Sequence, residues 1–119
     1  MARGLMLCDD LIFTSKVTGT ARALGLEVKS TRDMRALLTL AGQEAPSCVL
    51  IDLHNPGLDL PTLLADLRTA CPAMPRVIAY GSHVEAATLH AARVAGCDLV
   101  LPRSRFVEEL PTALPAWLG

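Results

Sequence analysis

Two stretches, Leu5-Met6-Leu7-Cys8-Asp9-Asp10 and Cys48-Val49-Leu50-Ile51-Asp52, decide the fold of this chain. Each is a short apolar run that ends in acidic residues, which is typical of a strand buried on both faces of a parallel sheet. Ligands bind at the carboxyl ends of such strands. If the two strands are neighbours, Asp9, Asp10 and Asp52 converge on one small patch. Such a patch suits a hard cation.

Outward from these two runs, short apolar segments alternate with segments of helical period along the whole chain. Strands are predicted at residues 4–8, 26–29, 48–51, 76–80 and 99–101, and helices at 13–24, 34–41, 60–67, 83–95 and 104–118. Right-handed crossovers between parallel strands imply a flavodoxin-like (βα)5 α/β fold, a three-layer sandwich around a five-stranded sheet. The second strand is the most polar and belongs at an edge, so we expect the order 2-1-3-4-5. We expect one domain over residues 1–119.

Local signals set expectations for the helix ends. Ser30 or Thr31 is expected to cap the second helix, and Asp59 is expected to cap the third. The fourth helix is expected to begin near His83. Pro111 and Pro115 lie inside the last helical segment and predict a kinked or two-piece helix.

Composition excludes several classes of protein. The net charge of −1 gives no general attraction to nucleic acid or to a membrane surface. The apolar run Gly4 to Cys8 is too short for a signal peptide or a membrane span, so a cytoplasmic location is expected. The four cysteines lack CxxC spacing and are predicted to be reduced, mostly buried thiols, which disfavours a zinc site.

The chain resembles the receiver domain of bacterial response regulators, the CheY-like superfamily, over essentially its whole length. The matching motifs are the pair Asp9-Asp10, Asp52 after the third strand, Pro56 four residues later, and the helix end Ala95-Gly96. The resemblance implies a signalling domain of two-component type and not an enzyme. It implies that these three carboxylates and the backbone carbonyl of His54 hold Mg²⁺. It also implies that Asp52 accepts a phosphoryl group from a histidine kinase.

The chain departs from the receiver pattern where receivers sense phosphate. Gly81 stands where receivers carry Thr or Ser, with Ser82 beside it, and Arg103 stands where they carry Lys. Ser82 either reaches a phosphate oxygen or caps the fourth helix. Arg103 either binds phosphate or pairs with the acidic pocket. The candidate phosphate-handling residues are therefore Asp52, Ser82 and Arg103.

Three functions are compatible with these residues. The first is a divergent receiver that binds Mg²⁺ weakly and accepts phosphate on Asp52. The second is a phosphorylation-independent pseudo-receiver that serves as an interaction module, which the residues at positions 81 and 103 favour. The third is a small flavodoxin-like enzyme or nucleotide binder. It is disfavoured because Asp9-Asp10 stands where a Gly-rich phosphate loop would follow the first strand.

The resemblance also implies a protein partner, either a histidine kinase or a downstream effector. In receivers the partner surface is formed by the fourth helix, the fifth strand and the fifth helix. In this chain that surface corresponds to residues 83–118. Homodimerisation stays open, and neither nucleic acid nor membrane is an expected partner.

Overall fold

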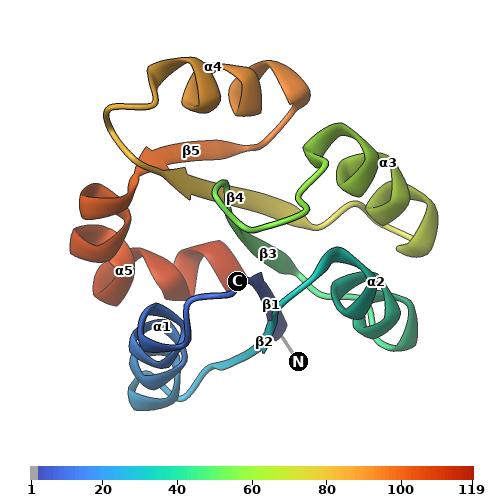
Figure 1. The fold of residues 1–119 in the computed structure, drawn as a ribbon. Coiled ribbons are helices and arrows are strands. Elements are labelled where there is room, and N and C mark those ends of the chain that lie inside the picture. Colours follow the sequence, from blue (N-terminus) through green and yellow to red (C-terminus); the bar gives the residue numbers. More distant parts are fainter. Residues whose placement is uncertain (1–2) are drawn as a thin grey trace.

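The structure, a computed structural model, describes residues 3–119 and contains alternating strands and helices (Figure 1). The strands are β1 (Arg3–Leu7), β2 (Glu27–Thr31), β3 (Cys48–Asp52), β4 (Arg76–Gly81) and β5 (Leu99–Pro102). The helices are α1 (Leu11–Ala23), α2 (Met34–Gln43), α3 (Leu60–Ala70), α4 (Ala86–Ala95) and α5 (Arg103–Leu118). All strand pairs are parallel and the order is β2-β1-β3-β4-β5. The predicted flavodoxin-like fold and strand order are confirmed.

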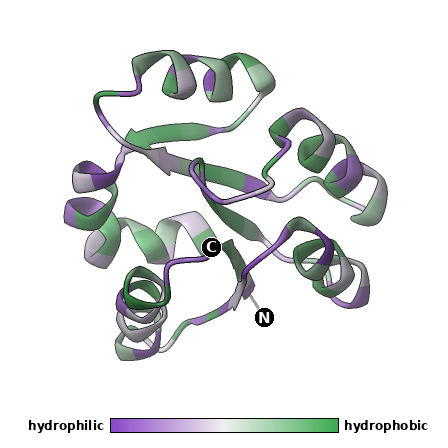
Figure 2. Ribbon diagram, viewed as in Figure 1, coloured by the Kyte–Doolittle hydropathy of each residue, from purple (hydrophilic) through white to green (hydrophobic). Residues whose placement is uncertain are grey.

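The sheet separates two apolar cores, as expected when near-continuous apolar strands are covered on both faces. Helices α1 and α5 cover one face, and α2, α3 and α4 cover the other (Figure 1). Figure 2 shows the apolar strands between helices whose outer faces are more hydrophilic. All four aromatic residues of the chain lie in the core under α1 and α5. Tyr80 stacks on Phe106 at 4.5 Å between ring centroids, and Phe106 on Trp117 at 5.6 Å, which anchors the end of α5.

The cap of α2 differs from the prediction. Strand β2 continues through Thr31, whose hydroxyl donates to the Met6 carbonyl at 2.8 Å. Ser30 and Thr31 therefore belong to the sheet, and Asp33 caps α2 by accepting the Ala36 N–H at 2.8 Å. The predicted cap of α3 is confirmed, since Asp59 accepts the Thr62 N–H at 3.2 Å.

Two further helix predictions need correction. Helix α4 begins at Ala86 and not near His83, because a turn closed by the Glu85 N–H and the Ser82 carbonyl at 3.0 Å precedes it. The Ser82 hydroxyl therefore does not cap α4. Helix α5 is continuous from Arg103 to Leu118, so the two-piece alternative is wrong. Its buried face, which includes Leu110 and Leu114, keeps the helix on the sheet despite the two prolines.

The cysteines are free, as predicted, and three of them are buried. Burial raises the pKa of the Cys48 thiol to about 12 and that of Cys97 to about 11. These two thiols are therefore poor nucleophiles and poor metal ligands at neutral pH. In the part of the chain that the structure describes, no helix has the length and apolar character needed to cross a membrane.

Candidate functional site

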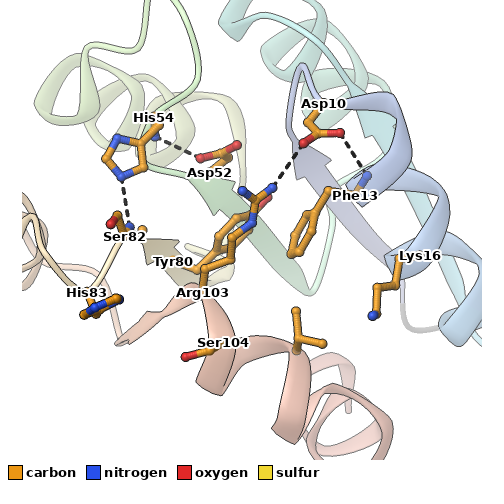
Figure 3. A pocket seen from close by; sticks show the side chains of 12 residues that line it. Asp10, Phe13, Lys16, Asp52, His54, Tyr80, Ser82, His83, Arg103 and Ser104 are labelled. Carbon is orange, nitrogen blue, oxygen red and sulfur yellow. Dashed lines mark hydrogen bonds and ion pairs between the residues drawn. The ribbon is translucent and has the colours of Figure 1, made fainter.

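A pocket of about 730 Å³ opens at the carboxyl edge of the sheet, between α1, the end of β4 and the start of α5 (Figure 3). Five residues singled out from the sequence line this pocket, namely Asp10, Asp52, His54, Ser82 and Arg103. Asp9 does not line it. Its carboxylate pairs with the Arg32 guanidinium at 3.2 Å, and both side chains are exposed. The predicted convergence of three carboxylates thus holds for Asp10 and Asp52 only.

Asp10 uses both of its carboxylate oxygens. One oxygen accepts the Phe13 N–H at 3.0 Å and so caps α1, which also meets the helical role considered for this residue. The other lies 3.2 Å from a terminal nitrogen of Arg103. The Phe13 N–H, ahead of the Arg103 guanidinium, holds the pKa of the Asp10 carboxyl below its ordinary value. Asp10 is therefore ionised and neutralised within the protein.

Asp52, at the end of β3, faces a thiol. One carboxylate oxygen accepts the His54 N–H at 2.9 Å, and the other lies 3.5 Å from the Cys8 sulfur. Successive side chains of a strand point to opposite faces, so when Cys8 points inward, Asp9 points away. The alternation after β1 therefore places sulfur, and not a second carboxylate, beside Asp52.

The arrangement does not fit a magnesium site as it stands. Mg²⁺ needs free oxygen ligands in octahedral geometry. Every carboxylate oxygen of Asp10 and Asp52 already faces a protein donor. Within residues 3–119 no group of three metal-binding side chains is found. Lys16 and Arg103 also line the pocket and balance the charge of its two carboxylates.

Arg103 is the first residue of α5 and reaches across the pocket to α1. Besides its ion pair with Asp10, its guanidinium lies over the Phe13 ring, 4.3 Å from the centroid. Of the two roles left open by the sequence, the structure contains the ion pair. Both partners are about half exposed, so the pair contributes little stability by itself. Its consequence is positional, because it occupies the space in front of the acidic residues.

The side chain of His54 links two loops of the site, a role that the sequence did not reveal. Its Nε2 accepts the Ser82 N–H at 3.0 Å, which joins the loop after β3 to the loop after β4 (Figure 3). A Cβ placed on Gly81 would lie 3.3 Å from this Nε2 and 3.3 Å from Leu89. Glycine at position 81 therefore makes room for the imidazole. That substitution was the available signal, although the sequence gave no reason to connect it with His54.

Tyr80 is a second functional residue that the sequence did not reveal. It lines the pocket but is only 1% exposed. Its hydroxyl has no hydrogen-bond partner among residues 3–119. Burial raises the pKa of this phenol well above its ordinary value, so the group is a neutral hydroxyl. A buried polar group without a partner is unfavourable and is uncommon away from sites of function.

Comparison with known proteins supports the assignment of the fold. No protein-family model and no curated protein matches the sequence. Among solved structures, the receiver domain of NtrX from Brucella abortus superposes with a TM-score of 0.81 at 22% identity, covering 97% of each chain. The receiver domain of Francisella response regulator 1452 gives 0.80 at 20% identity, over 99% of this chain and 97% of its own.

A third structure is a response regulator from Burkholderia pseudomallei with a phosphorylated aspartic acid, a calcium ion and citrate. It superposes with a TM-score of 0.79 at 24% identity, over 100% of this chain and 67% of its own. The chain therefore has the fold of response-regulator receiver domains.

Proposed function

We propose that this chain is a signalling domain of two-component type that works as a phosphorylation-independent interaction module and not as an enzyme. The observation that carries the proposal is the ion pair between Arg103 and Asp10, at 3.2 Å, inside the pocket. A phosphoryl group on Asp52 would need a cation to offset its charge. Here the cation present is an arginine that is already paired.

The loop contacts support the same proposal. A phosphorylation switch needs contacts that differ between its two states. The loop after β4 has no hydroxyl at Gly81 to move toward a phosphate, and His54 already holds the Ser82 N–H at 3.0 Å. One conformation of this loop is therefore stabilised without phosphate.

The proposed partner is a protein that packs against the surface of residues 83–118. Two of the large exposed apolar side chains flank α4, namely Val84, which is 73% exposed, and Val94, which is 74% exposed. Burial of apolar side chains is the main favourable term in protein association. A histidine kinase, a downstream effector or a second copy of this chain could supply the matching surface. We place the interaction in the cytoplasm, where free cysteines stay reduced.

A second candidate is the receiver that binds Mg²⁺ and accepts phosphate on Asp52. The observation in its favour is that Asp10 and Asp52 line one pocket beside His54. Mg²⁺ would have to displace Arg103 from Asp10 before the two carboxylates and the His54 carbonyl could act as ligands. Replacing Asp10 or Asp52 by Asn would then abolish Mg²⁺ binding.

Exposure to acetyl phosphate and Mg²⁺ separates the two candidates. Intact mass spectrometry would follow the parent chain, Asp52→Asn, and Asp66→Asn as a control on an exposed carboxylate of α3. We expect no mass increase in any of the three proteins. A phosphoryl mass on the parent and on Asp66→Asn, lost in Asp52→Asn, would overturn the interaction module in favour of the second candidate.

A further inference from the structure

The pocket holds features that neither proposed function uses. It is within the size range of small-molecule sites. Phe13, Tyr80 and Val107 give it an apolar wall, while Lys16 and Ser104 add polar groups on the side of α1 and α5. Figure 3 shows Lys16 reaching toward α5 on the side of the pocket away from Asp52. This half of the pocket is thus distinct from the carboxylate half.

The charge that is left without a partner in this half is positive. Lys16 forms no ion pair with any residue in the range 3–119. Arg103 uses one terminal nitrogen on Asp10 and keeps other N–H groups available, because a guanidinium has five. These two cations lie on either side of Phe13 in the sequence-distant elements α1 and α5.

The start of α5 adds to this positive potential. The residue before it is Pro102, and no side chain of the described residues caps this helix. Its first turn carries Arg103 and Arg105, although cations are unfavourable near the positive end of a helix dipole. Ser104, in the same turn, lines the pocket. An anion at this position would satisfy free N–H groups and relieve the repulsion between the cations and the helix dipole.

The Tyr80 hydroxyl is an independent sign of a ligand. The side chain is 99% buried, it lines the pocket, and its hydroxyl lacks a partner among the described residues. A ligand with a polar atom near this group would remove the cost of leaving it unpaired.

We propose that the α1–α5 half of the pocket binds a small organic anion. A carboxylate or phosphate group lies against Lys16, Arg103 and the first turn of α5. An apolar body packs on Phe13 and Val107, and a polar atom of the ligand meets the Tyr80 hydroxyl. The inference goes beyond the proposed interaction module and does not depend on it.

The test uses α-naphthyl phosphate as the probe, with α-naphthol and inorganic phosphate as the two halves of its chemistry. Amide NMR titrations of the folded chain would compare the three compounds. We expect α-naphthyl phosphate to bind at least about tenfold more tightly than either control, because both anion and apolar contacts are used. The shifted amides should be those of Phe13, Lys16, Ser104 and Val107.

Matched variants locate the site. Lys16→Gln should weaken α-naphthyl phosphate binding roughly fivefold, the effect of one exposed ion pair. Lys29→Gln removes the only other lysine, which lies on β2, and should leave binding unchanged. Tyr80→Phe should also weaken binding. Equal binding by the parent, Lys16→Gln and Tyr80→Phe, or no preference over the two controls, would overturn the inference. The interaction module would be unaffected, because its test follows phosphate on Asp52.

Discussion

Replacing Tyr80 by Phe should make the protein more stable. The substitution removes one hydroxyl that is buried and lacks a hydrogen-bond partner among residues 3–119. The ring and its contacts remain, including those with Phe106 at 4.5 Å and Phe13 at 5.0 Å between centroids. The change therefore isolates the free energy of the unpaired hydroxyl.

The expected size follows from the burial of this group. Burying a hydroxyl without a hydrogen bond costs about 1–3 kcal/mol in proteins. The small void left by the oxygen takes back part of that gain, since dispersion contacts are lost. We therefore expect Tyr80→Phe to raise the free energy of unfolding by about 1 kcal/mol and the melting temperature by about 4 °C.

Urea denaturation followed by circular dichroism would measure this change, with the slope m expected to stay constant. Tyr80→Leu serves as the control for the ring itself and should destabilise the protein by about 2 kcal/mol. A loss of stability in Tyr80→Phe would refute the reasoning. It would mean that the hydroxyl forms a favourable hydrogen bond in solution.

Three other substitutions test the contacts of the site. Asp10→Asn keeps a good helix cap but removes the charge. The pKa of Asp10 is lowered in the folded state, so its contribution to stability is present above the ordinary carboxyl pKa and is lost as pH falls through the lowered folded value. The melting temperature of the parent should thus fall more steeply in acid than that of Asp10→Asn, and parallel curves would contradict this. Gly81→Thr should lose about 1–3 kcal/mol in urea denaturation, and Gly81→Ala less, because the added atoms press on His54 and Leu89; unchanged stability in both would show that the loops are not in contact. His54→Ala should speed amide exchange at Ser82, with His83→Ala as the control, and equal protection in the two variants would exclude the latch.

Much of the fold could be predicted from the sequence because its signals are local. Apolar runs such as Cys48 to Ile51 identify buried strands, and the polar second strand identifies an edge. The acidic ends of β1 and β3 correctly located the pocket. Predictions at helix ends were less accurate, because competing hydrogen bonds decide them. Thr31 bonds to Met6 across the sheet, which leaves Asp33 to cap α2.

The contacts inside the pocket could not be predicted, because they join residues that are distant in the sequence. Arg103 and Asp10 are 93 positions apart, and His54 and Ser82 are 28 apart. The sequence allowed Arg103 either a phosphate or a carboxylate partner, and only the tertiary arrangement decides between them. Side-chain direction was the other gap. Asp9 and Asp10 are adjacent, yet only Asp10 lines the pocket.

The response to a phosphate mimic tests the central claim most directly. Amide NMR spectra of the isotope-labelled chain would be recorded with Mg²⁺ alone and then with Mg²⁺ and beryllofluoride. We expect shifts, where there are any, to be confined to the surroundings of Asp10, Asp52 and Ser82. The amides of α4 and β5 should stay in place, because Gly81 and the His54 contact give phosphate no means of moving them. Large, Mg²⁺-dependent shifts that spread through Ala86–Ala95 and Leu99–Pro102 would contradict a phosphorylation-independent module and identify a working switch.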